Sequence, residues 1–240
     1  MNNSWFDSKK LKCIVLCAGG GKRITPHSKE TPKVMIEIEN KPILGYIIDY
    51  WNKYTNDFIF VVGYKKEQVI EYVNNLPINA KFVEQKELNG IADALSYVEE
   101  LVSDNFIVVL GDCIYKGEFN YPKDMRQGIG VRKTVDIEDI KGNYSVEIKN
   151  DIICKVVEKP KKVVNDLCGM GFYFFNKKVF DYIKITKPSK LRNEIEITDV
   201  IQNMIDAGEK IKPSFFNGKY INITFPEDIK KAKKLLFNQD

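Results

Sequence analysis

Short runs rich in β-branched residues alternate with helical patterns over the first half of the chain, and this alternation restricts the fold more than any other feature of the sequence. The runs that predict strands are residues 11–16, 57–62, 80–84 and 105–110. The segments with apolar residues at helical spacing are residues 42–54, 67–74 and 91–102. Strands that alternate with helices form β-α-β units, in which the strands run parallel within a buried sheet. We therefore expect an α/β fold whose first half is a doubly wound, largely parallel sheet.

The pattern changes after residue 112. Strand-like runs now follow one another with only short turns between them, at residues 128–133, 144–148, 152–158 and 171–175. Asn150 and Asp151 predict a hairpin turn, because both residue types tolerate positive φ. Helical patterns return at residues 177–182, 197–207 and 227–237, and Pro226 suits the start of the last one. We predict a single domain over residues 1–240, whose half from about residue 113 is more antiparallel and covers the ligand of the other half.

The scarcity of histidine and the spacing of the cysteines exclude several kinds of site. His27 is the only histidine, so a Ser-His-Asp triad or a histidine-rich zinc site would depend on one imidazole, which we expect on a surface loop. The five cysteines are dispersed and contain no C-x-x-C pair, which is typical of reduced thiols inside the cell. No apolar run approaches the ~18 residues of a membrane span. We therefore expect a cytoplasmic protein that does not bind membranes.

The charge balance favours a small anionic ligand over a nucleic acid. The net charge of +4 is mildly basic and evenly spread. No continuous basic stripe is interleaved with aromatic residues, so we expect no nucleic-acid partner. The aromatic run at residues 172–175 is interpreted as alternating core.

A glycine-rich segment follows directly after the first predicted strand. It reads Ala18-Gly19-Gly20-Gly21-Lys22-Arg23, and Lys33 follows ten residues after the arginine. Glycines let the backbone approach a ligand closely and turn its N–H groups toward phosphate oxygens. A guanidinium suits a diphosphate, and an ammonium suits a single phosphoryl group. The segment matches neither a Walker A loop nor a dinucleotide fingerprint, so it predicts a phosphate site of another kind, with an ordinary strand-to-helix turn as the alternative.

Together with later motifs, this segment resembles the signature of the sugar-1-phosphate nucleotidyltransferases. The family signature, G-x-G-x-R-[LI]-x-P followed by P-K, is matched by Gly19, Gly21, Arg23, Ile24, Pro26, Pro32 and Lys33. Further segments resemble later family motifs in the right order: residues 41–44, Gln85 with 90–94, 110–112, 157–160, 169–173, 196–199 and 221–228. The resemblance implies the nucleotide-diphospho-sugar transferase type of fold, a Rossmann-like doubly wound, mostly parallel mixed sheet with an antiparallel half that binds the acceptor.

The resemblance also implies a reaction and a set of site residues. Members join the NMP of an NTP to a phosphorylated acceptor and release pyrophosphate, with Mg²⁺ as cofactor. An acceptor phosphate is already ionised at neutral pH, so no general base is needed, which agrees with the single histidine. The implied catalytic residues are Arg23 and Lys33, and the implied metal ligands are Asp112 and Asn222. The implied nucleotide-binding residues are Ala18, Gly19, Gly20, Gly21, Gln85 and Gly90, and the acceptor-binding residues are Tyr144, Glu158, Lys159 and Gly171.

Three of these residues also have ordinary structural interpretations. Asp112 could be a solvated strand-end carboxylate, and Asn222 could be a turn residue. Lys159 belongs to a run of lysines, and such runs are usually solvated surface. Retention of Arg23 and Lys33 together with Asp112 nevertheless favours an enzyme over the contrasting class, a non-catalytic nucleotide-sensing regulatory subunit.

The sequence leaves the two substrates open. Gln85 offers an amide donor and a carbonyl acceptor, so it can pair with a pyrimidine edge of either polarity, and Gly90 leaves room for the base. We therefore expect a pyrimidine triphosphate, CTP, UTP or dTTP, over a purine one, and Gln85 does not choose among the three. Tyr144 or Ser145 stands near the position where sugar-activating members carry a glycine, and a bulky Tyr144 would narrow the space for a pyranose.

The acceptor is therefore either a sugar 1-phosphate or a small non-sugar phosphate or phosphonate, of a phosphocholine-like or phosphorylated amino-acid-like kind. The chain ends soon after its last motif, so it resembles the short, single-domain branch of the family, which includes cytidylyltransferases. A homodimer is possible.

Overall fold

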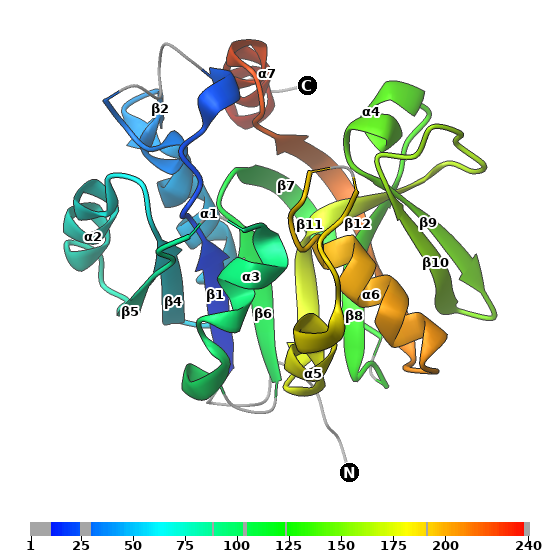
Figure 1. Cartoon of the computed structure of the whole chain (residues 1–240). Coiled ribbons are helices and arrows are strands. Elements are labelled where there is room, and N and C mark those ends of the chain that lie inside the picture. The colour runs from blue at the N-terminus through cyan, green and yellow to red at the C-terminus, as the bar shows by residue number, and fades with distance from the viewer. Residues whose placement is uncertain are drawn as a thin grey trace.

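The computed structural model describes residues 11–24, 30–87, 89–102, 105–122, 124–190 and 192–237. Within these residues, a ten-stranded mixed sheet runs through the middle of the molecule and helices cover both of its faces (Figure 1). Within the same ranges, no helix is long and apolar enough to cross a membrane.

Parallel strands form one side of the sheet. In spatial order they are β5 (Asn79–Glu84), β4 (Asp57–Val62), β1 (Lys12–Leu16) and β6 (Asn105–Leu110). The chain passes from β1 outward to β4 and β5 and then crosses to β6, on the other side of β1. The strand order therefore reverses between β1 and β6, which is where open α/β sheets place their ligands.

Helices on the two faces explain why β4, β1 and β6 are apolar along most of their length. Cys13 and Val15 of β1 pack into the core on one face, to which α1 (Ile43–Trp51), α2 (Lys66–Asn74) and α7 (Pro226–Phe237) contribute. Ile14 packs into the core on the other face, with α3 (Ile91–Ser96), α5 (Lys178–Ile185) and α6 (Ile197–Asp206). A strand buried on both faces needs an apolar residue at every position. The predicted doubly wound α/β sheet is confirmed.

The other side of the sheet is mostly antiparallel, as expected. The long strand β11 (Leu167–Asn176) runs antiparallel to β6 on one side and to β8 (Gln127–Lys133) on the other. β12 (Ile211–Asn222) runs parallel to β8, and β7 (Cys113–Phe119) lies antiparallel to β12. A hairpin of β9 (Tyr144–Lys149) and β10 (Ile152–Glu158) joins the sheet beside β11, at the right in Figure 1. Its turn has the positive φ predicted for Asn150 (50°) and Asp151 (59°).

Several elements differ from the predicted pattern. The predicted helix 42–54 ends at Trp51, and the predicted helix 91–102 divides into α3 and a 3-10 turn at Glu99–Leu101. β7, β12 and α4 (Ile137–Gly142) were not predicted. The short pair β2 (Glu37–Ile38) and β3 (Lys41–Pro42) and the 3-10 turns Lys22–Ile24 and Lys33–Met35 were not predicted either. The aromatic run 172–175 is buried in β11, as expected.

Candidate functional site

Two adjoining cavities open at the end of the sheet where β1 and β6 terminate. The first, of about 440 Å³, is lined by the six predicted nucleotide-binding residues and by the predicted charged ones: Ala18, Gly19, Gly20, Gly21, Gln85, Gly90, Arg23, Lys33 and Asp112. The second, of about 770 Å³, is lined by the predicted acceptor residues and Asn222: Tyr144, Glu158, Lys159, Gly171 and Asn222. Arg23 and Asp112 line both cavities. The structure thus brings all the predicted site residues together, whereas Pro26 and His27 lie outside the described residues.

The glycines of the loop have two different structural causes. Gly21 has a φ of 63°, a left-handed backbone conformation that side chains disfavour, and a Cβ there would lie 2.8 Å from the Cβ of Lys33. Gly19, by contrast, would place a Cβ with no heavy atom of the described residues within 4 Å. Gly21 is therefore needed by the fold, whereas Gly19 leaves open the space in which a ligand would lie.

This difference predicts opposite phenotypes for two alanine variants. Gly21→Ala is expected to lower the free energy of unfolding by about 1–2 kcal/mol, because the left-handed backbone is costly for any residue with a Cβ. Gly19→Ala is expected to leave the free energy of unfolding almost unchanged and to weaken nucleotide binding. Urea unfolding and nucleotide titration of both variants measure the two effects. An unaltered unfolding curve for Gly21→Ala would contradict the assignment.

An ion pair joins the two charges of the first cavity. Lys33 begins a 3-10 turn directly after Pro32, and its Nζ lies 2.6 Å from Oδ2 of Asp112, which follows β6. The side chains are 12% and 27% exposed, so both remain within reach of a ligand. The ammonium group of Lys33 therefore holds Asp112, which is not simply a solvated strand-end carboxylate.

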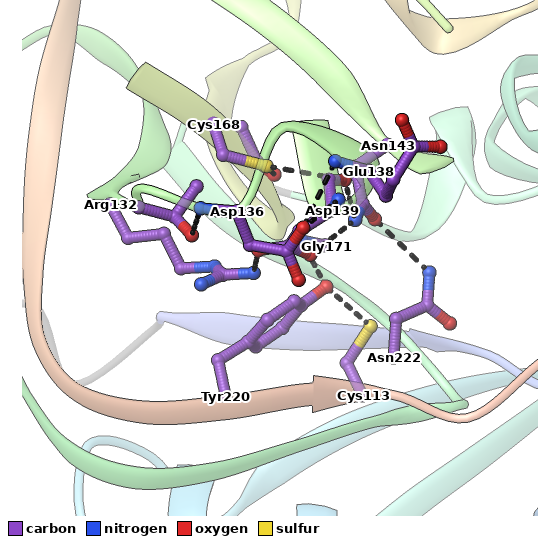
Figure 2. A network of polar contacts seen from close by, with 12 residues as sticks. Cys113, Arg132, Asp136, Glu138, Asp139, Asn143, Cys168, Gly171, Tyr220 and Asn222 are labelled. Carbon is purple, nitrogen blue, oxygen red and sulfur yellow. Dashed lines mark hydrogen bonds and ion pairs between the residues drawn. The ribbon is translucent and has the colours of Figure 1, made fainter. Parts of the chain in front are cut away.

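Asn222, the last residue of β12, lies beside the turn that contains Asp112. It pairs with Cys113 in the sheet, and the N–H of Ile223 donates to the carbonyl of Asp112 at 2.8 Å. Figure 2 shows the amide nitrogen of Asn222 directed at the side-chain oxygen of Asn143, 3.3 Å away. The amide oxygen of Asn222 is turned away from Asn143 and accepts a hydrogen bond from the hydroxyl of Thr224 at 3.4 Å, and its second lone pair could still bind a cation.

These two residues fit a metal ion that is shared with a substrate. Mg²⁺ in proteins is usually held by one or two side-chain oxygens, with substrate phosphates and water as the other ligands. Asp112, in the turn between β6 and β7, and Asn222, at the end of β12, would supply two such oxygens. Among the described residues, no group of three or more histidine, cysteine, aspartate or glutamate side chains could hold a metal.

Gln85 and Gly90 form the far wall of the first cavity. Gln85 follows β5 and is only 5% exposed, and its Nε2 donates to Oδ2 of Asp93 at 2.8 Å and to the carbonyl of Gly90 at 3.4 Å. Gly90 has a φ of 110°, and a Cβ there would lie 2.8 Å from the carbonyl oxygen of Ile195. We expected this glycine to make room for a base. The missing Cβ instead makes room for the segment that contains Ile195.

Tyr144 contributes to the second cavity differently from our expectation. Its ring lies against Gly169, where an added Cβ would come within 1.8 Å of the ring, and its hydroxyl donates to the carbonyl of Met170 at 3.0 Å. Only 5% of the residue is exposed, so the ring takes little of the space that we expected it to occupy. Ser145 is also buried, within the sheet. The structure therefore gives no steric reason against a pyranose.

A cluster of charges lies at the end of β10. Arg192 lies 3.1 Å from Oε1 of Glu158, and the hydroxyl of Thr198 donates to Oε2 at 3.3 Å. Burial, reinforced by the charge of Glu196, raises the pKa of the Glu158 carboxyl to about 7, although Arg192 and Lys159 act in the opposite direction. Glu158 is therefore partly protonated near neutral pH.

Lys159 belongs to this cluster and not to the solvated surface. It is half-buried, whereas Lys161 and Lys162 of the same run are exposed. Its backbone has a φ of 42°, and its N–H donates to the carbonyl of Asn143 at 2.8 Å. Burial and the charge of Arg192 lower the pKa of its ammonium. An anion placed between Lys159 and Arg192 would relieve this repulsion.

Two residues of the site were not predicted. Arg192 lines the second cavity, and the only sequence signal for it is its i,i+4 spacing to Glu196, with which it forms an ion pair. Asp93 holds the amide of Gln85; the sequence places both residues in one family motif but does not indicate the hydrogen bond between them.

The raised pKa of Glu158 predicts a pH dependence of stability. The folded protein keeps this proton up to about pH 7, whereas the unfolded chain releases it near its ordinary value of 4.5, so the free energy of unfolding falls as pH rises between the two values. The loss amounts to roughly 3 kcal/mol. Glu158→Gln should remove this loss of stability. Urea unfolding of both proteins at pH 5 and pH 8 measures the difference. The exposed Glu67→Gln on α2 is the control, and equal pH dependence of wild type and Glu158→Gln would refute the prediction.

Comparison with known proteins agrees with this geometry. A family model described as nucleotidyl transferase matches residues 12–229. The bifunctional protein GlmU of Methanocaldococcus jannaschii is 34% identical over 229 residues, which are 95% of this chain and 55% of that protein. This chain thus spans about half the length of that relative. The UTP–glucose-1-phosphate uridylyltransferase AglF of Haloferax volcanii is 31% identical, over 94% of this chain and 96% of its own length.

Solved structures show the same fold. A UDP-glucose pyrophosphorylase complexed with UDP-glucose superposes with a TM-score of 0.81 at 24% identity, over 93% of this chain and 97% of the other. An inositol-1-phosphate CTP transferase from T. maritima gives a TM-score of 0.80 at 24% identity, over 95% of each chain. The family match covers nearly every element that surrounds the two cavities, and this protein belongs to the nucleotidyl transferase family.

Proposed function

We propose that this protein transfers a nucleotidyl group from a pyrimidine nucleoside triphosphate to a sugar 1-phosphate and releases pyrophosphate. The observation that carries the proposal is the pair of adjoining cavities, which share Arg23 and Asp112. A nucleotide in one cavity and an acceptor in the other would meet at these two residues. The relative AglF, whose name gives UTP and glucose 1-phosphate as substrates, supports the proposal because its length matches this chain.

The residues of the first cavity would hold the triphosphate. Arg23 and the N–H groups of residues 18–21 would bind the β- and γ-phosphates, which leave as pyrophosphate. Lys33 would offset the negative charge that develops at the α-phosphate while the acceptor oxygen forms its bond to phosphorus and the bond to the β-phosphate oxygen breaks. Mg²⁺, when bound, would supply further positive charge at these phosphates, and Asp112 with Asn222 would hold it.

The residues of the second cavity would hold the acceptor. Lys159 and Arg192 would bind its phosphate, and Glu158 would accept a hydrogen bond from a hydroxyl group. The lining mixes charged, amide and hydroxyl groups, as a polyhydroxylated ligand requires.

The same cavity is less suited to a quaternary ammonium. Of its lining aromatic residues, Tyr144, Tyr173 and Tyr220 are buried and only Phe225 is exposed, whereas an aromatic cage for an ammonium group uses several open ring faces. A sugar 1-phosphate therefore suits the cavity better than a phosphocholine-like acceptor.

Pyrophosphate release with a matrix of nucleoside triphosphates and phosphorylated acceptors tests the proposal. We expect turnover with a pyrimidine triphosphate and a hexose 1-phosphate, and little with phosphocholine or a phosphonate. Efficient use of phosphocholine would overturn the acceptor assignment, and preference for ATP or GTP would overturn the nucleotide assignment. Nucleotide binding without pyrophosphate release from any pair would favour a regulatory subunit.

A further inference from the structure

The amide of Gln85 is held in one orientation by its neighbours. Its Nε2 faces two acceptors, Oδ2 of Asp93 at 2.8 Å and the carbonyl of Gly90 at 3.4 Å. Reversing the amide would bring its oxygen against both acceptors, and a carboxylate has no proton to donate at neutral pH. The polarity that the sequence left open is therefore fixed by the hydrogen bonds. The hydrogen bonds of Gln85 within the described residues involve Nε2 and leave Oε1 without a donor there, and Gln85 is one of the residues that line the first cavity.

Asp93 is itself held in place. It lies in the first turn of α3 between Ala92 and Ala94, both of which are buried in the core. The N–H of Ala92 donates to the carbonyl of Ile195 at 3.2 Å, so the start of the helix is bonded to the segment before α6. The carboxylate of Asp93 is thus presented to Gln85 by a packed helix and not by a free loop.

We propose that Asp93 determines the nucleobase preference, because it forces Gln85 to present a hydrogen-bond acceptor to the base. This inference rests on the proposed function, in which the first cavity holds the nucleotide. The N3–H of uracil or thymine would donate to Oε1 of Gln85, whereas N3 of cytosine is itself an acceptor and would face that oxygen without a proton between them. The site therefore selects UTP and dTTP, which share this edge, and rejects CTP. Asp93 is a positioning residue that acts through Gln85 and does not touch the nucleotide.

Dissociation constants for UTP, dTTP and CTP, measured by calorimetry with Mg²⁺ and without acceptor, test this inference. We expect the full-length wild type to bind UTP and dTTP similarly and CTP at least about tenfold more weakly, because two facing acceptors leave both unsatisfied. In Asp93→Asn the side chain at position 93 can donate as well as accept, so the amide of Gln85 can turn. The ratio of the CTP and UTP dissociation constants should then fall below about threefold.

A double-mutant comparison separates this role from a structural one. In Gln85→Leu the ratio should already be close to one, and adding Asp93→Asn should not change it further. Asp181→Asn is the matched control. It removes the same charge from an exposed position in the first turn of α5, and it should keep the wild-type ratio of the two dissociation constants. Thermal unfolding verifies that each variant folds, and Asp93→Ser replaces Asp93→Asn if the latter does not.

The outcomes distinguish this inference from the proposed function. Wild type that binds CTP as tightly as UTP, or an Asp93→Asn variant with an unchanged ratio, overturns the role of Asp93. Equal weakening of all three nucleotides by Asp93→Asn also overturns it, because only the stability of α3 would then be involved. Wild type that shows the base preference but releases no pyrophosphate with any acceptor overturns the proposed function and leaves the role of Asp93 intact. Wild type that binds no nucleotide overturns both.

Discussion

Replacing Lys33 with alanine is expected to lower kcat/KM for pyrophosphate release by about 10²- to 10³-fold, the usual cost of removing a fixed charge at a reacting centre. The Nζ of Lys33 is already directed into the site by Asp112, so its position needs no rearrangement when a nucleotide binds. The free energy of unfolding should change little, because 27% of the Asp112 side chain is exposed and water can replace the lost partner. Arg23→Ala should have an effect of the same size, since Arg23 is exposed and lines both cavities.

A second lysine provides the matched control for this prediction. Lys66 forms an ion pair with Glu84 on the surface of α2 and β5, and it lines neither cavity. Lys66→Ala removes a comparable charge and should leave pyrophosphate release unchanged. Near-normal turnover by Lys33→Ala or Arg23→Ala, with unfolding curves like that of wild type, would remove the catalytic assignment.

Asp112→Asn is expected to reduce turnover at least about 10²-fold, and Asn222→Ala only about tenfold. The carboxylate would provide a metal ligand and a negative charge, whereas the amide of Asn222 would provide only an oxygen that a water molecule can replace. Turnover should stop in EDTA and return with Mg²⁺ or Mn²⁺. Both variants are assayed over a range of Mg²⁺ concentrations.

The shape of the metal titration is the informative part of that experiment. Excess Mg²⁺ should largely restore Asn222→Ala and should not restore Asp112→Asn. Undiminished turnover in EDTA, or an Asp112→Asn enzyme that behaves as wild type, would exclude the metal assignment. Equal losses in the two variants would mean that the negative charge of Asp112 is not what matters.

The elements that the sequence predicts well are those with a simple hydrophobic pattern. β4, β6 and β10 begin and end at the predicted residues, because a strand buried on both faces, or paired in a tight hairpin, leaves an unambiguous pattern. β7 was missed because Lys116 and Glu118 interrupt its apolar residues, as suits a strand at the edge of the sheet.

α4 could have been recognised from its N-terminus. It has only six residues, too few for a periodic pattern, but the side chain of Asp136 accepts hydrogen bonds from the N–H groups of Glu138 and Asp139. An aspartate in this position before two acidic residues is a helix-start signal. The sequence therefore contained the information, in a form that hydrophobic periodicity does not detect.

The candidate site was predictable in its residues but not in its geometry. The family motifs identify Gln85 and Lys159, and Tyr144 stands near a position where sugar-activating members carry a glycine; the structure places all three at the cavities. The sequence could not reveal that the amide of Gln85 has one polarity or that the ring of Tyr144 lies on Gly169. These properties depend on contacts between elements, which a motif does not encode.

Because Lys33 and Asp112 form an ion pair, a ligand that draws one of them away leaves the other charge without its partner. A bare triphosphate that attracts Lys33 leaves Asp112 facing negative phosphates without a partner, and a bare divalent cation that attracts Asp112 leaves Lys33 beside a like charge. Only a ligand that brings both signs of charge together compensates both side chains as they separate. If the site binds a metal-bound nucleotide, we expect the ion pair to disfavour free phosphates and free cations before any contact with a base or a sugar is made.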